Sequence, residues 1–463
     1  MLFHSPQFLV FFAIYFAAQL LIPPRRRLWL VLAGGTIFYG YWNPWLVWLP
    51  HLLGLTGWAG ARWLAQAGDL SGRKLRFAAS VAALLAPLLF FKYVNFLYRQ
   101  VLGALFVLPD WSLAVPLPLG VSFVTFTMLA YLIDCYRGVY PVEPRAPMVS
   151  GYMVFFPHLI AGPILRPREL IPQLAKPRPA LAINARLGLL LFTVGLAKKA
   201  ILANQFADAV DPVYAGGAGL TALDYLLAIY GFPAQIYCDF SGYTDMALGL
   251  ALLLGVKLPS NFDRPYAAAT VAEYWRRWHR TLSFWLRDYI YIPLGGNRGG
   301  RWRRARNIMV TMILAGFWHG AGWTFALWGA VHGLAIVFNR LVGGRDRRRS
   351  AVAQAGAVLT TFHFVTLAFI LFRASDLGTF WRVLSGPFAA PRGDFGAFFA
   401  LNAYSLLLLA AFYLSHRFDT HARLRLAIRR AHPAVLWSAA ALVWAVAIAA
   451  SAGGSTKFIY FDF

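Results

Sequence analysis

Residues 307–340, NIMVTMILAGFWHGAGWTFALWGAVHGLAIVFNR, are the segment that most strongly indicates the fold class. It is largely apolar, and arginine-rich segments flank it at 298–306 and 340–349. Short basic loops mark the cytoplasmic side of a membrane protein, so both ends of the stretch should face the cytoplasm. A spanning helix needs about 20 residues, and the 34 residues present are too few for a pair of full crossings. We therefore expect a re-entrant or shallow hairpin.

The middle of this hairpin reads GFWHGAGW at 316–323, and its three glycines favour a break or tight turn. Irregular backbone at membrane depth persists only where it is packed in protein or lines a wet cavity. His319 would lie at the tip of the hairpin. An ionisable side chain inside a span is a functional-site hypothesis by default. The alternative is a neutral core histidine bonded to a neighbouring carbonyl.

Composition places the whole chain in a membrane. Its 463 residues are 59% hydrophobic and 13% charged, and apolar runs recur from residue 7 to residue 450. We expect an all-α polytopic protein with one integral membrane domain over 1–463. The net charge of +25 lies in short loops between apolar runs, which argues against nucleic-acid binding. Cys135 and Cys238 lie in apolar runs, and the sequence has no CxxC or His-rich spacing, so neither a disulfide framework nor a metal site is expected.

Ten apolar runs are candidate spans, and several are long enough to contain a break, which predicts roughly nine to twelve crossings. They lie near 7–22, 28–49, 77–107, 114–134, 185–203, 221–256, 307–340, 353–372, 399–415 and 434–452. The basic segments 24–27 and 417–430 should share the cytoplasmic side with those at 298–306 and 340–349.

A second histidine lies in residues 273–291, EYWRRWHRTLSFWLRDYIY. Apolar side chains recur there with helical spacing, at 275, 278, 282, 285 and 289. Arginines occupy the opposite side, which is typical of an amphipathic helix lying in the membrane interface. His279 falls on the edge of the apolar stripe and should point inward. The alternative is a helix resting among the headgroups, with His279 as a polar edge residue.

A third polar stretch, YCDFSGYTD at 237–245, places two carboxylates beside an apolar run. Buried carboxylates must be paired, hydrogen-bonded or protonated, so this is either a polar lining or a structural network. His158 lies in an apolar run too short to span, which favours a loop dipping into protein. His332 is expected to be structural. No GxSxG, P-loop, GxGxxG after a strand or HExxH motif is present, which leaves histidine as the best available base.

These motifs together resemble the membrane-bound O-acyltransferase (MBOAT) family, in particular its bacterial alginate O-acetylation branch. The resemblance extends nearly end to end. It is carried by FYGYWNP at 38–44, PLGVSF at 118–123, AGPILR at 161–166, CDFSGYTD at 238–245, WRRWHRTLSFWLRDY at 275–289, FWHG at 317–320 and FIYFDF at 458–463. One departure is Asp462, where the family pattern has glutamine.

The resemblance implies a ring of helices around a thinned centre, with a funnel that brings the two membrane faces close. It makes His319 the catalytic histidine and His279 the second motif histidine, with no metal. The motif positions imply a substrate-binding set: Trp278, Trp318, Asp239, Ser241, Tyr243 and Arg166.

The implied activity is transfer of an acyl group, in this branch acetyl from acetyl-CoA, without a cofactor. The acceptor would be a hydroxyl of an extracytoplasmic polysaccharide, or of a periplasmic SGNH-type transferase acting as a relay. Such a protein would be multi-pass in the bacterial inner membrane. The alternatives are D-alanyl transfer to teichoic acid and a non-catalytic scaffold or exporter. A transporter often has matching broken helices in its two halves, which are not evident here.

Overall fold

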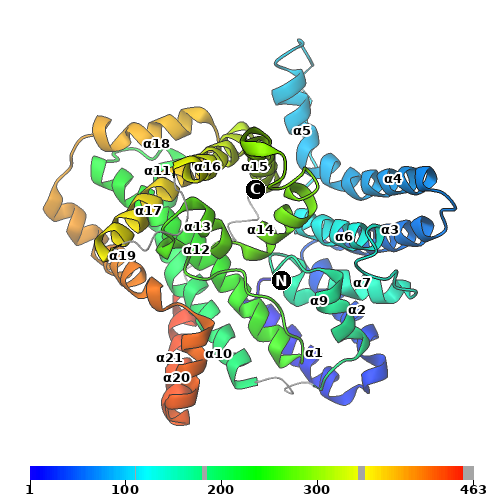
Figure 1. Ribbon diagram of the computed structural model, residues 1–463. Helices are drawn as coiled ribbons and strands as arrows, with labels where there is room; N and C mark the ends of the chain where they lie inside the picture. Colours follow the sequence, from blue (N-terminus) through cyan, green and yellow to red (C-terminus); the bar gives the residue numbers. More distant parts are fainter. Residues whose placement is uncertain (110, 180–184, 343–349, 452–463) are drawn as a thin grey trace. The chain divides into compact units, whose positions relative to one another are not determined.

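The computed structural model describes residues 1–109, 111–179, 185–342 and 350–451, and every regular element in these ranges is a helix (Figure 1). The predicted all-α membrane fold is confirmed. Most of the basic segment predicted at 340–349 lies outside the described residues. The whole motif at 458–463 also lies outside them. Residue contacts divide the chain into two compact units, Met1–Phe192 with Met246–Pro259, and Thr193–Asp245 with Ser260–Phe463. One membrane domain over 1–463 stays a prediction.

The first unit is built from helices of the N-terminal part of the chain. They are α1 (Pro6–Leu21), α2 (Arg27–Gly40), α3 (Trp48–Ala65), α4 (Leu70–Leu88), α5 (Val94–Phe96), α6 (Val121–Tyr136), α7 (Ala146–Val154), α8 (Phe156–Leu159) and α9 (Pro167–Ala175). Two further helices, α10 (Ala185–Leu196) and α12 (Ala222–Leu253), belong partly to each unit.

The remaining helices belong to the second unit. They are α11 (Asn204–Ala215), α13 (Val271–Arg277), α14 (Arg280–Leu286), α15 (Gly300–His319), α16 (Trp323–Val342), α17 (Ala351–Arg373), α18 (Leu377–Ala389), α19 (Phe395–Ser415), α20 (His421–Arg430) and α21 (Pro433–Ser451). The π-helical segment η5 (Ala197–Ala203) joins α10 to α11.

Six helical stretches in the described part of the chain are long and apolar enough to cross a membrane, so this is a multi-pass membrane protein. They are Leu70–Leu102, Ala185–Ala215, Trp323–Leu341, Ala351–Arg373, Phe395–Phe418 and Pro433–Ala450. Two shorter apolar helices are α1 and α6. The total number of crossings stays a prediction.

The predicted span at 28–49 is wrong, because the chain breaks at Asn43-Pro44. Helix α2 ends at Gly40, and the Asn43 side chain accepts a hydrogen bond from the Trp45 amide at 2.9 Å. Helix α3 begins only at Trp48 and packs against α4, α6 and α7 (Figure 1). Its glycines lower the hydropathy that would identify it, although they allow close helix packing: a Cβ on Gly57 would clash with Met128 of α6.

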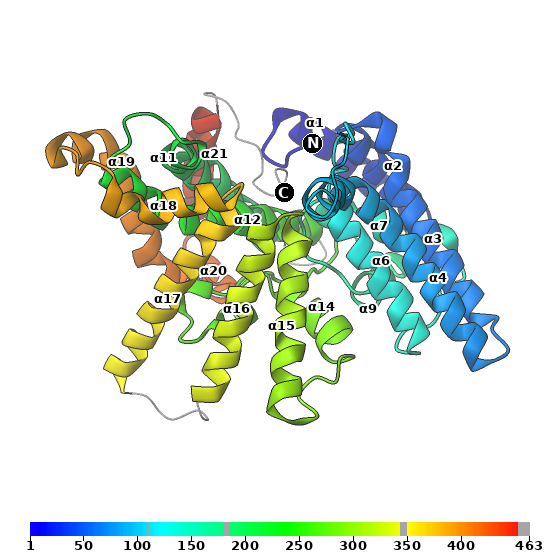
Figure 2. The same ribbon diagram turned by 90° about the horizontal axis from the view of Figure 1, so that it is seen from above.

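The central hairpin of the second unit has longer helices than predicted. Figure 2 shows α15, α16 and α17 running side by side, and α15 packs extensively against α16. Helix α15 begins at Gly300 and has 20 residues, as does α16. At 1.5 Å per residue each is about 30 Å long, but of the two helices only α16 is also apolar enough to be a candidate membrane span. The arginine-rich segment expected as a loop is part of α15 and lengthens it, and the re-entrant or shallow position of the hairpin in the membrane stays a prediction.

The polar stretch 237–245 lies within a single helix, since α12 is continuous over 32 residues despite Pro233. A helix of that length is about 48 Å long. Its side chains Tyr237, Asp239, Ser241 and Asp245 are therefore held in fixed order along one rigid element. This helix supplies the second unit with the polar groups described below.

Candidate active site

His319 is the last residue of α15 and is 2% exposed. The next residue, Gly320, leaves the helix with extended backbone, and a Cβ there would clash with the Phe325 ring. The break therefore falls at 320–322, as the sequence predicts. Gly316 is not part of it: this glycine lies inside α15, where a Cβ would clash with the Phe325 carbonyl of α16. Close packing of the two helices thus fixes the end that carries His319.

Aromatic rings form the walls around the His319 imidazole. Its ring centroid lies 4.9 Å from Trp318, 5.1 Å from Trp328 and 5.1 Å from Phe372 of α17. A histidine in such surroundings is shielded from bulk water.

His279 lies at a sharp break between α13 and α14, with its backbone in the left-handed region at φ 40°. The prediction of one amphipathic helix over 273–291 is therefore wrong, although all five stripe residues are buried. Left-handed backbone is uncommon outside glycine and concentrates at functional sites. The prediction that His279 points inward is confirmed, since it is fully buried.

The break brings His279 next to the end of α15. Its ring centroid is 6.5 Å from that of His319 and 5.7 Å from that of Trp318, with Phe240 of α12 on another side at 4.7 Å. His279 is outside the candidate spanning helices, and burial lowers its pKa to about 3. It is neutral at physiological pH, so its ring can donate one hydrogen bond and accept another. We call His279, His319, Trp318 and Trp328 the histidine site.

Of the two tryptophans predicted to bind substrate, one contacts both histidines and the other packs against different aromatic rings. Trp318 is 4% exposed and contacts both histidines. Trp278 packs instead against Phe262, Tyr274 and Phe369, at centroid distances of 5.1, 5.7 and 5.6 Å. These contacts make Trp278 a support beneath the neighbouring His279. Arg166 belongs to the first unit, where its backbone amide donates to the Glu169 carboxylate at 2.8 Å. Substrate binding by these residues stays a prediction.

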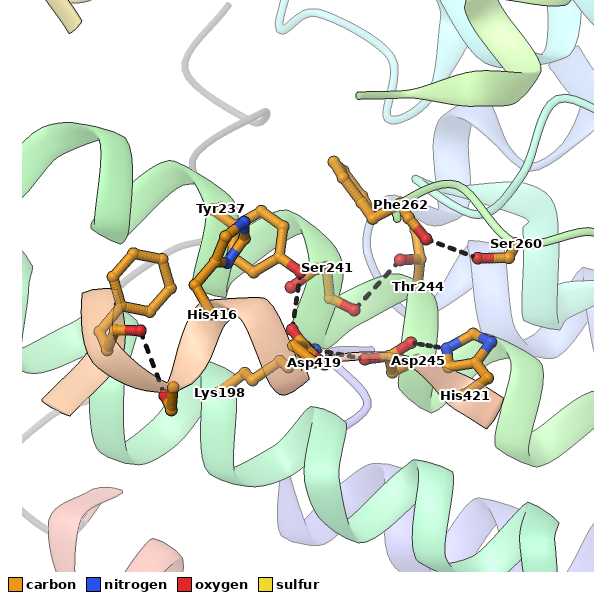
Figure 3. A network of polar contacts seen from close by, with 12 residues as sticks. Lys198, Tyr237, Ser241, Thr244, Asp245, Ser260, Phe262, His416, Asp419 and His421 are labelled. Atoms are coloured by element: carbon orange, nitrogen blue, oxygen red, sulfur yellow. Dashed lines mark hydrogen bonds and ion pairs between the residues drawn. The ribbon is translucent and has the colours of Figure 1, made fainter. Parts of the chain in front are cut away.

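The carboxylates of α12 take part in buried ion pairs, which favours the structural network of the two alternatives for 237–245. Figure 3 shows Lys198 of η5 between Asp245 and Asp419, at 2.8 and 2.7 Å. His421 contacts the other oxygen of Asp245 at 2.9 Å, and the Tyr237 hydroxyl donates to Asp419 at 2.6 Å (Figure 3). We call these five residues the lysine network.

A neighbouring pair joins the same two elements, because Lys199 Nζ lies 2.6 Å from Asp239 and both side chains are 3% exposed. Lys199 is thus the counter-ion of Asp239. The Ser241 hydroxyl, by contrast, is buried and has no hydrogen-bond partner among the described residues. A substrate role for Asp239, Ser241 and Tyr243 stays a prediction.

Comparison with known proteins decides the family. The model of the "MBOAT, membrane-bound O-acyltransferase family" matches residues 140–374, which include both histidines. The chain belongs to the MBOAT family. It is therefore an acyltransferase.

The MBOAT chain is similar to several curated proteins over most of its length. A "Probable alginate O-acetylase AlgI" of Azotobacter vinelandii is 36% identical over 394 residues, covering 84% of this chain and 78% of that protein. A "Peptidoglycan O-acetyltransferase" of Helicobacter pylori is 35% identical over 423 residues, covering 83% and 79%. A "Teichoic acid D-alanyltransferase" of Streptococcus thermophilus is 28% identical over 281 residues, covering 55% and 68%.

Sequence reasoning missed the cations of this MBOAT protein. Lys198 and Lys199 lie inside the apolar run at 185–203, and two charges in a candidate span should have indicated partners for the carboxylates of α12. Asp419 gave a weaker signal, because it is one acid within a basic segment. Only the fold brings it to Lys198, more than two hundred residues away along the chain.

Proposed function

We propose that this MBOAT protein transfers an acetyl group from a cytosolic thioester to a hydroxyl on the far side of a bacterial inner membrane. The observation that carries the proposal is the pair of buried histidines with ring centroids 6.5 Å apart: His319 at the end of α15, and His279 at the break between α13 and α14. The identity of about a third to O-acetylating relatives over most of the chain supports acetyl as the group transferred.

In the proposed reaction His319 acts as general base. It accepts the proton of the acceptor hydroxyl as that oxygen attacks the thioester carbonyl carbon. The tetrahedral intermediate then collapses, the carbon–sulfur bond breaks, and the proton passes from His319 to the departing sulfur. A positioned base of this kind contributes about 10²–10⁴-fold in rate. Neutral His279 would donate a hydrogen bond to the developing oxyanion or orient the hydroxyl.

We propose acetyl-CoA as donor and an envelope or secreted polysaccharide, reached directly or through an SGNH-type relay transferase, as acceptor. Arginines crowd the first turns of α15, at 301, 303, 304 and 306, on the side assigned to the cytoplasm. Such a cluster would attract the phosphates of a coenzyme A thioester.

The test is deletion of the gene in its host. Acetate released by alkali from each isolated polymer should fall for one envelope or secreted polysaccharide, while polymer length is unchanged. Complementation with the intact gene should restore the acetate, and complementation with His319→Ala should not. Unchanged acetylation together with lost polymer export would overturn the proposal in favour of an exporter.

A further inference from the structure

A second cluster of aromatic and histidine side chains adjoins His319, and two of its members lie on α16. The Trp328 ring contacts both His319 and His332, at centroid distances of 5.1 and 4.8 Å. Trp328 and His332 are both fully buried. The Trp275 indole of α13 completes the cluster, 5.6 Å from Trp328 and 5.5 Å from His332.

The hydrogen bond within this cluster fixes where His332 carries its hydrogen. The Trp275 indole N–H is a donor only, and it donates to Nδ1 of His332 at 3.2 Å. Nδ1 must therefore present its lone pair. The hydrogen of the neutral imidazole is on Nε2, which makes that nitrogen a donor.

Two buried donors of the cluster have no acceptor within the described part of the chain. They are Nε2–H of His332 and Nε1–H of Trp328. A buried donor left without an acceptor destabilises the fold. A phenylalanine at position 328 would carry no such donor. The retained N–H groups therefore point to an acceptor that the chain does not supply.

We propose that the N–H groups of Trp328 and His332 bind the carbonyl oxygen of the acyl donor. The inference rests on the proposed acyl transfer at His319. Trp328 lies in ring contact with His319, which places the proposed donors in the same buried cluster as the base. Donors at that place would hold the carbonyl for attack and stabilise the oxyanion that forms on it. The aromatic rings of Trp275 and Phe372 around the cluster match an apolar acyl group.

The test compares two coenzyme A analogues that differ at the carbonyl. In acetyl-dethia-CoA a methylene replaces the thioester sulfur and the carbonyl remains. In S-ethyl-CoA a methylene replaces the carbonyl. Neither can transfer an acetyl group, so equilibrium affinity for the purified protein in detergent can be measured by calorimetry. The intact protein should prefer the carbonyl analogue by about 3- to 10-fold, as expected for hydrogen bonding to a neutral oxygen.

Matched variants isolate each donor. Trp328→Phe removes the indole N–H, and His332→Asn removes the donor at the Nε2 position while its shorter side chain retains an acceptor for Trp275. Both should shrink the preference while leaving the affinity for S-ethyl-CoA within about twofold. His332→Gln places an amide N–H near the lost Nε2 and should restore part of the preference. Phe364→Leu is the packing control, because Phe364 contacts the His332 ring at 5.5 Å and carries no donor.

The outcomes separate this inference from the proposed function. An undiminished preference in Trp328→Phe and His332→Asn would overturn the subsite, and water would then be the acceptor of the two N–H groups. Equal loss in Phe364→Leu would overturn it too, since packing alone would explain the effect. If the intact protein acetylates polymer but shows no preference, only the subsite is lost. If it binds neither analogue, the assignment of acetyl-CoA as the donor is overturned together with the subsite.

Discussion

The histidine site and the lysine network are both buried and polar, but they treat charge in opposite ways. The network brings together a lysine and two carboxylates at distances of 2.7 to 2.8 Å. In the histidine site the contacts of His279 and His319 described above are aromatic rings and each other. Buried charges need partners, whereas a base that works at a dry site must be able to exchange a proton.

The two regions also differ in what holds them in place. The network links η5 and α12 to the segment after α19, so its groups are committed to one another. The histidine site is held by backbone features instead: the close approach of α15 and α16 at Gly316 and the left-handed residue His279. Loss of a network residue should therefore affect stability first. Loss of a site histidine should affect turnover first.

The largest expected effect is that of His319→Ala. Acyl transfer should fall by about 10²-fold or more, because the general base is lost. The fold should persist, since His319 is held by ring contacts at a helix end and loses no large apolar surface. Alkali-released acetate from the complemented deletion strain measures the first quantity, and gel filtration of the purified variant measures the second. Normal acetylation by a monodisperse variant would remove the catalytic assignment.

Removal of the central cation should instead act on stability. Lys198→Met leaves Asp245 and Asp419 facing each other, and a broken buried pair costs about 3–5 kcal/mol. We expect the lower end, because the Asp419 side chain is 26% exposed. The melting temperature in detergent, followed by tryptophan fluorescence, should fall by about 5 °C or more. Lys74→Met at an exposed position is the control and should change it little. A Lys198→Met variant as stable as this control would contradict the structural reading of the network.

The sequence predicts these two regions unequally, for physical reasons. His319 and the helix break are local: glycines, a histidine and flanking charge lie within a few residues of one another. The length of α15 was not predictable in that way, because the arginines were expected to form a loop although the helix begins among them. The lysine network combines residues from η5, α12 and the segment after α19, and no local pattern joins them. Likewise, the break at His279 overrides a helical stripe that is regular on both sides of it.

A third substitution sharpens the comparison within the histidine site. His279→Gln retains one donor and one acceptor, so transfer should fall by about 10- to 100-fold, at or below the cost of losing one oxyanion donor. The lowered pKa of about 3 means that His279 takes up a proton only as the pH approaches that value. Between pH 5 and 8 the variant should therefore lower the rate without moving the midpoint of the pH–rate profile. A shifted midpoint would show that His279 titrates with the reaction.

The smallest expected effect lies at the rim of the lysine network. His421→Gln removes the pair with Asp245, but the His421 side chain is 24% exposed and Asp245 still has Lys198. Exposed pairs contribute about 0–1 kcal/mol, so the melting temperature should fall by no more than about 4 °C. The Debye length shrinks to about 3 Å at 1 M salt, which should erase most of this small difference while the Lys198→Met effect persists in the shielded interior. Melting curves of both variants at 0.1 M and 1 M sodium chloride provide the measurement. If His421→Gln were as destabilising as Lys198→Met and equally insensitive to salt, the histidine would belong to the buried centre of the network rather than to its rim.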